Sequence, residues 1–235
     1  MKASFKIFCT IILGILISFS GFTQECNAAL FLKPGNVLEY TSYDKKGKVS
    51  GSAIHETLSL KEDGDKIIAT IKVTSKDDKK KNEFSSEYEA TCQNGLFSVD
   101  MMRFFDSQQL QQYDADDFTI TMDGNVLEFP AGMKPGDALN DGNFTVKVNK
   151  DAFTIVTMLF NITNRQIHPN ESITTDAGTF DCQKVTYDFD SKMGFIKIKG
   201  SGVEWYNNDK AIVKSESYSK KGKLLGYSEL TGKTE

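Results

Sequence analysis

Apolar and polar residues alternate with a period of two along most of the chain, which is typical of strands that bury one face. Residues 66–74 place Ile67, Ala69, Ile71 and Val73 on one face, and residues 195–199 (FIKIK) alternate strictly. Residues 202–230 contain three such runs, joined by the turns 207–209 (NND) and 220–223 (KKGK). This C-terminal stretch predicts an antiparallel β-meander.

Roughly a dozen segments of this kind, separated by short turns, predict an all-β sandwich or barrel rather than βαβ units. The first turn, 45–48 (KKGK), resembles the last, so the first and last hairpins are expected to be neighbours in a closed sheet. Asp123 and Gly124 predict a hairpin between 118–122 and 125–129. Residues 101–113 (MMRFFDSQQLQQY) break the alternation and predict a short helix or lid.

Residues 1–28 have the layout of a secretory signal peptide, with Lys2 and Lys6, an apolar run over 11–19 and a small-residue site that ends at Ala28. The apolar run is shorter than the roughly 20 residues of a membrane span. Lipoprotein processing at Cys26 is the alternative, but residues 23–25 (TQE) lack the Leu-small-small pattern that this processing reads. We predict one domain over 29–235, soluble after signal removal, in the periplasm or secreted.

Removal of this leader takes away two lysines and one glutamate, which changes the formal net charge from −4 to −5. A mildly acidic protein has no electrostatic reason to bind nucleic acid or anionic lipid headgroups. No nucleic-acid partner is therefore expected.

Two cysteines, Cys92 and Cys182, remain after cleavage, and in an oxidising compartment an even pair favours a disulfide over free thiols. This bridge would close a loop of about 90 residues and contribute on the order of 4 to 5 kcal/mol. A metal or redox pair is less favoured, because no histidine or other cysteine lies near either residue.

Catalytic chemistry has little support in the sequence. The two histidines, His55 and His168, are isolated, and no nucleophile elbow, HExxH, P-loop or GxGxxG motif occurs. The carboxylates at 114–117, Glu87 and Glu89 are more typical of solvated turns and outer strand faces than of a glycosidase or calcium site. We predict no catalytic residues, no metal, no cofactor and no enzyme activity.

Apolar side chains remain as candidates for ligand binding. Flexible methionines and aromatic rings suit an apolar cavity, although filling the core is the simpler role for each of them. Trp205 is a candidate for the cavity mouth, with a buried strand pair as its alternative. The predicted ligand-binding residues are Met101, Met102, Phe104, Phe105, Met158, Phe160 and Trp205.

Three stretches carry a family resemblance: 33–51 (KPGNVLEYTSYDKKGKVSG), 177–189 (AGTFDCQKVTYDF) and the meander 202–230. Together they resemble the exported TapB-like proteins of Bacteroidota, which are grouped with domains of unknown function. The resemblance implies an antiparallel meander that closes into a barrel or half-barrel, similar to lipocalin-like polyisoprenoid binders or to lipoprotein carriers. It implies no catalytic residues.

Two hypotheses for function follow. The first is an exported binding protein that holds an apolar or lipid-like ligand inside a β-barrel. The second is a structural or interaction module of the cell envelope, which would contact a protein partner through strand edges or charged hairpin tips.

Overall fold

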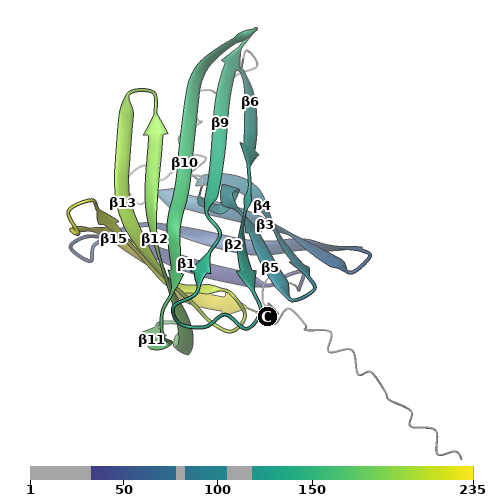
Figure 1. Ribbon diagram of the computed structural model, residues 1–235, viewed down its shortest axis with the longest axis vertical. Coiled ribbons are helices and arrows are strands. Elements are labelled where there is room, and N and C mark those ends of the chain that lie inside the picture. The colour runs from purple at the N-terminus through teal and green to yellow at the C-terminus, as the bar shows by residue number, and fades with distance from the viewer. Residues whose placement is uncertain (1–32, 78–82, 105–117, 235) are drawn as a thin grey trace, which may run out of the picture.

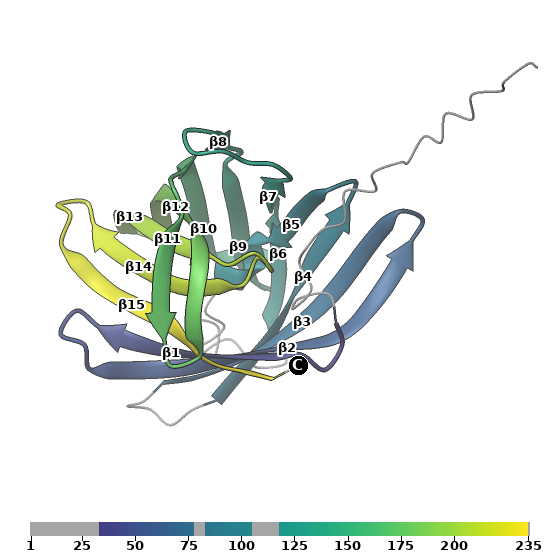
Figure 2. The ribbon, with the colours of Figure 1, turned by 90° about the horizontal axis from the view of Figure 1, so that it is seen from below.

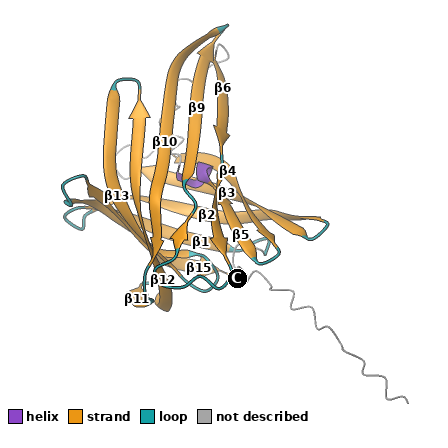
Figure 3. Ribbon diagram, in the orientation of Figure 1, coloured by secondary structure: helices purple, strands orange, loops and turns teal. Residues whose placement is uncertain are grey.

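The computed structural model describes residues 33–77, 83–104 and 118–234, most of which form β-strands. The predicted leader and the acidic cluster at 114–117 lie outside these residues. Within them, the strands are interrupted by the short 3-10 helix η1, Met101–Phe104 (Figure 3). The strands are β1 Val37–Asp44, β2 Val49–Asp63, β3 Lys66–Asp77, β4 Glu83–Gln93, β5 Leu96–Asp100, β6 Phe118–Gly124, β7 Val126–Pro130, β8 Ala138–Leu139, β9 Gly142–Lys150, β10 Phe153–Ile167, β11 Glu171–Thr175, β12 Gly178–Met193, β13 Ile196–Tyr206, β14 Ile212–Ser219 and β15 Leu224–Thr234.

The strands form one antiparallel sheet in the order β6-β9-β10-β12-β13-β14-β15-β1-β2-β3-β4-β5-β7, and β8 and β11 pair at its side. The sheet curls into a nearly closed barrel (Figure 1). Seen from below, β1 and β2 lie across the interior from β9 and β10 (Figure 2). The predicted all-β barrel is confirmed.

The barrel has one seam, between β6 and β7, which are the two ends of the sheet and are consecutive in the chain. Asn125 joins them. Its backbone N–H donates to the carbonyl of Asn143 at 3.0 Å, and its side-chain Oδ1 accepts from the Asn143 N–H at 2.7 Å. The chain thus pairs with β9 before Asn125 and with β5 after it, so a single residue spans the seam.

Arg165 bridges the seam beside β7, where no β-ladder is present among the described strands. Its buried guanidinium donates to the carbonyl oxygens of Glu128, at 3.3 Å, and Asn140, at 2.8 Å. It also lies over the ring of Phe129, with 4.8 Å from Cζ to the ring centroid. The side chain of Arg165 therefore connects neighbouring segments at the seam, whereas backbone hydrogen bonds connect them elsewhere in the sheet.

The predicted closure by like hairpins is confirmed, because β1 pairs with β15 from Val37↔Thr234 to Asp44↔Gly226. The C-terminal meander is confirmed as β13, β14 and β15. The alternation that predicted strands also assigns their faces. In β9, Phe144, Val146 and Val148 are buried in the core, whereas Lys147 is exposed.

The hairpin predicted at Asp123 and Gly124 is wrong. Both residues lie within β6, and β6 and β7 are at opposite ends of the sheet. The glycine serves close packing instead of a turn, since a Cβ at position 124 would lie 2.8 Å from the Cβ of Phe144. The helix predicted over 101–113 begins as predicted at Met101, and its described part ends at Phe104.

The disulfide predicted between Cys92 and Cys182 is wrong, because Cys182 is a free thiol. Cys182 lies fully buried in β12, in a small cluster with Trp205 and Val213 beneath β11. This cluster is on the opposite face of β13 from Tyr206, which belongs to the main core inside the barrel. Cys92, in β4, is disulfide-bonded, but not to Cys182.

Candidate binding cavity inside the barrel

The interior of the barrel contains a cavity of about 240 Å³ near η1. An adjoining space of about 350 Å³ towards β2 and β3 shares five of its lining residues. The cavity combines aromatic rings, serine hydroxyls and charged groups. It is lined by Tyr40, Ser42, Ala53, His55, Tyr88, Arg103, Phe104, Tyr187, Glu204, Ile212, Ser215, Ser217 and Ser228.

The helix η1 positions Arg103 in this cavity. The carboxylate of Asp100 accepts the backbone N–H of Met102 at 2.8 Å and so satisfies a donor of the first turn. Met101 is fully buried in the core and anchors the turn. As a result, the side chain of Arg103 extends into the barrel. Its place directly after Met101 and Met102 gives no sign of this in the sequence.

Arg103 forms a buried ion pair with Glu204 of β13, with 2.8 Å between Nη2 and Oε2. The same nitrogen donates to the hydroxyl of Tyr206 at 2.7 Å, and this hydroxyl in turn donates to Glu204. Burial is the largest single effect and opposes the charge on Arg103, but Glu204, together with the surrounding tyrosine hydroxyls, offsets it and raises the pKa of Arg103 above its ordinary value. The pair is therefore a fixed, charge-balanced feature of the interior.

One hydrogen-bond donor of the Arg103 guanidinium is not used by the contacts described so far. The Nε of Arg103 is buried and has no hydrogen-bond partner within the described ranges. A buried donor without a partner costs about 1 to 3 kcal/mol relative to a satisfied one. The guanidinium also stacks on Phe104, with 4.3 Å from Cζ to the ring centroid. A ligand with an acceptor oxygen beside Arg103 would satisfy this donor.

His55 also lines the cavity. Its Nδ1 is 3.1 Å from the hydroxyl of Tyr88, and its ring centroid is 4.9 Å from that of Tyr40. Burial, assisted by the positive charge of Arg103, lowers the pKa of His55 to about 4. At neutral pH the imidazole is therefore uncharged and presents one donor and one acceptor.

An aromatic ladder continues from the cavity to the strands of the opposite wall. Phe104 stacks on Phe160 with 5.7 Å between ring centroids, and Phe160 lies 5.3 Å from Phe144 and 6.2 Å from Phe189. The cavity thus combines polar groups at Arg103 and His55 with the ring of Phe104, behind which the aromatic ladder runs to β10 and β12. Such a surface suits non-covalent binding of an amphipathic molecule.

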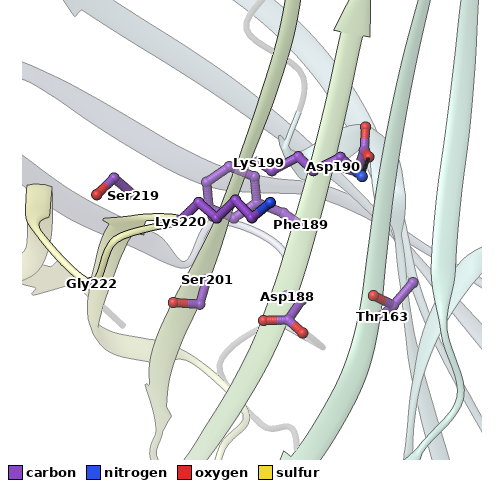
Figure 4. A pocket seen from close by; sticks show the side chains of 10 residues that line it. Thr163, Asp188, Phe189, Asp190, Lys199, Ser201, Ser219, Lys220 and Gly222 are labelled. Carbon is purple, nitrogen blue, oxygen red and sulfur yellow. Dashed lines mark ion pairs between the residues drawn. The ribbon is translucent and has the colours of Figure 1, made fainter.

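A second depression, of about 470 Å³, lies over β12 and β13 beside the turn at Lys220 (Figure 4). Three of its four charged groups have partners, and the fourth, Lys220, is exposed. Asp188 accepts a hydrogen bond from Asn164 at 2.8 Å, and Asp190 forms an ion pair with Lys199. This depression is the weaker candidate, since it offers a ligand no unsatisfied buried group.

The sequence-predicted ligand residues are divided among several places. Phe104 lines the cavity, whereas Met101 and Met158 are buried core residues. Met102 and Phe160 are half-buried and pack against the core. Phe105 lies outside the described residues.

Trp205 does not line the cavity, because it lies on the outer face of the sheet under β11. There its Nε1 donates to Glu171 at 2.7 Å, and Lys184 donates to the same carboxylate at 2.8 Å. Of the histidines, His55 faces the cavity, and His168 contacts the hydroxyl of Thr186 at 2.8 Å.

Sequence reasoning missed the polar groups that define the cavity, namely Arg103, Glu204, Tyr88 and the role of His55. The available signal was positional. In β13, Glu204 and Tyr206 face inward and Trp205 faces outward. Alternation therefore predicts that the Glu204 side chain is buried, and a buried carboxylate is rare unless it has a partner.

Together, the fold and the cavity define an antiparallel barrel protein with a polar pocket in its interior. The chain belongs to the DUF3108-like family, whose model matches residues 33–230. Among the described residues, no helix is both long and apolar enough to cross a membrane. A comparison with curated proteins finds no significant match.

Two solved structures have a similar fold. The first is from Bacteroides fragilis NCTC 9343 and is described as a candidate exported protein with a YmcC-like fold; it is 26% identical, with a TM-score of 0.72, over 86% of this chain and 97% of that one. The second, from Parabacteroides distasonis ATCC 8503, is described as a candidate lipoprotein; it is 23% identical, with a TM-score of 0.71, over 86% and 96% of the two chains.

Proposed function

We propose that the protein is an exported, non-catalytic binding protein that holds a lipid-like, amphipathic molecule inside the barrel. The observation that carries this proposal is the buried Arg103, whose Nε donor is unsatisfied next to a cavity. The descriptions of the two similar structures support an envelope, periplasmic or secreted location.

The polar end of the ligand would lie between Arg103 and His55. Glu204 balances the charge of Arg103, and His55 is uncharged at neutral pH, so these groups give the cavity no net charge. A carboxylate ligand would add an uncompensated charge to this site. The cavity therefore favours an uncharged polar group with acceptor oxygens, such as an ester, an amide or a hydroxyl.

The apolar part of the ligand would follow the ladder from Phe104 to Phe160 and Phe189. Phe104 lines the cavity and stacks on Phe160, which in turn stacks on Phe189, so a ligand that reaches past Phe104 would meet apolar rings. This arrangement narrows the apolar or lipid-like ligand predicted from the sequence to one with two chemically different ends. The TapB-like and lipoprotein-carrier resemblance agrees with such a ligand and remains part of the proposal.

Solvent extraction of the protein, exported by a Bacteroidota host and purified, tests the proposal. Mass spectrometry of the extract should reveal a bound amphipathic molecule. The double variant Arg103→Met with Glu204→Met should lose this molecule, because it replaces the ion pair with apolar side chains of similar size and leaves no unpaired buried charge.

The matched control is Lys199→Met, which removes an exposed lysine and should retain the ligand. An empty extract from the parent protein, or equal ligand content in the parent and the double variant, would contradict the proposal. Recovery of the protein in a stable envelope complex, without a small molecule, would favour the alternative of an interaction module.

A further inference from the structure

The tip of the β12–β13 hairpin exposes apolar side chains that no described part of the protein covers. Phe195 is fully exposed, and Ile196 and Ile198 are more than half exposed. Lys192 and Lys197 form a cross-strand pair at the same tip and are also exposed. Aromatic and aliphatic residues flanked by lysines at the end of a projecting hairpin contribute nothing to the core.

Two neighbouring hairpins carry exposed lysines at their turns. The β1–β2 turn contains Lys45, Lys46 and Lys48, and the β14–β15 turn contains Lys220, Lys221 and Lys223. Because β13 pairs with β14 and β15 pairs with β1, the three turns follow one another along one rim of the sheet. The β1–β2 and β14–β15 tips project on the same side of the molecule in Figures 1 and 2. We call these eight lysines, with Lys192 and Lys197 included, the basic rim.

Among the described residues, Asp44 is the acidic side chain at the first turn of the basic rim, and its charge interacts with Lys46 and Lys48. Asp44 folds back on its own turn and accepts the backbone N–H groups of Lys46, at 2.7 Å, and Lys48, at 3.0 Å. Asp190 pairs with Lys199, which is outside the rim as defined. No ion pair in the described ranges engages any lysine of the rim. A chain with a formal net charge of −4 thus concentrates positive charge on one edge.

The shape and chemistry of this edge fit a lipid surface. The exposed apolar residues lie at the tip of one hairpin, and the lysines are spread over three hairpin tips. They therefore form no continuous patch of the roughly 800 Å² that a protein partner needs per side. A bilayer with anionic headgroups accepts both, because apolar tips enter its interface and lysines attract its surface charge. Net charge alone predicts that the protein does not bind anionic headgroups. That prediction does not take into account that the lysines are concentrated on one edge of the barrel.

We propose that the protein docks on anionic lipid bilayers through the β12–β13 tip, with Phe195 and Ile196 entering the interface and the basic rim contacting the headgroups. This contact does not depend on the ligand proposed for the cavity. It would bring the rim of the barrel, and the end of the aromatic ladder at β12, to the membrane.

Vesicle co-sedimentation of the purified exported protein tests this contact. Vesicles of phosphatidylcholine with phosphatidylglycerol should bind it at least about tenfold more tightly than phosphatidylcholine alone, and added salt should weaken binding. Phe195→Ser with Ile196→Ser, and separately Lys220→Glu with Lys221→Glu, should each reduce binding by about tenfold or more.

The matched controls are Leu58→Ser and Lys61→Glu, which change exposed residues of β2 away from the rim and should bind like the parent. All substituted side chains are exposed, so an unchanged thermal transition confirms folding. Absence of vesicle binding, or equal binding by all variants, would overturn the proposal. So would self-association that the Phe195→Ser, Ile196→Ser variant abolishes in the absence of lipid, because the tip would then serve a second copy of the chain.

Discussion

Arg103 and Glu204 lie 101 positions apart in the chain, yet their side chains meet inside the barrel with 2.8 Å between Nη2 and Oε2. The contact connects η1, which follows β5 near the seam, to β13, which is separated from β5 by six other strands of the sheet. It thereby holds the helical turn that carries the polar end of the cavity.

Loss of one member of this pair should destabilise the protein strongly. We expect Glu204→Gln to lower the free energy of unfolding by about 3 kcal/mol, since it leaves the buried Arg103 charge uncompensated. Asp190→Asn, which breaks the more exposed ion pair with Lys199, should cost less than about 1 kcal/mol. Urea denaturation of both variants measures the difference, and equal losses would show that the interior pair has no special weight.

Stability should fall in acid through His55. Its folded-state pKa of about 4 lies below its ordinary value of 6.5, so the unfolded chain binds the proton more readily. The resulting loss begins as the pH falls below about 6.5 and reaches up to about 3 kcal/mol near pH 4. His55→Gln should lack this contribution, whereas His168→Gln should retain it. Denaturation curves from pH 7 to pH 4 compare the three proteins, and parallel acid profiles would refute the assignment.

Gly202 should not tolerate a side chain. A Cβ at this position would lie 2.2 to 2.5 Å from ring atoms of Tyr187, a wall of the cavity. We expect Gly202→Ala to cost about 1 to 3 kcal/mol and to displace Tyr187. Gly232→Ala, where the nearest atoms belong to the flexible side chain of Glu39 at 3.1 Å, is the matched control and should cost less. Thermal unfolding of both variants provides the measurement.

Cys182 should behave as an inert, reduced thiol. It is fully buried, and burial raises its pKa to about 11, so little thiolate forms at neutral pH. An alkylating reagent should leave Cys182 unmodified in the native protein and modify it after denaturation without any reductant. Peptide mapping locates the label; protection of Cys182 that persists in denaturant until a reductant is added would restore the disulfide rejected above.

The β-structure was predictable because strand burial is a local pattern. In β9 and β13 the alternation of side chains follows from the backbone itself, and the pairing of β1 with β15 could be inferred from two similar turns. The change of pairing partner after Gly124 could not be predicted, because a glycine required for close packing against Phe144 looks the same in sequence as a turn glycine.

The long-range contacts of the candidate site were beyond local patterns. Cys182 in β12 and Cys92 in β4 are separated by six strands of the sheet, and Cys182 faces outward. The even number of cysteines therefore predicted a pairing that the fold does not allow. The ion pair of Arg103 was missed for a related reason, because an inward arginine is recognisable only when its partner on β13 is known.

The single-residue seam also limits polymerisation. In the described part of the chain, β6 and β7 each pair on one side only, and an open strand edge is where another chain can add. The two edges are short, at seven and five residues, and β7 ends at Pro130, which has no N–H to donate. Arg165 already occupies the carbonyl of Glu128 on that edge. An incoming strand therefore finds few free groups, and a barrel that is not fully closed by backbone hydrogen bonds still presents little edge on which fibres can grow.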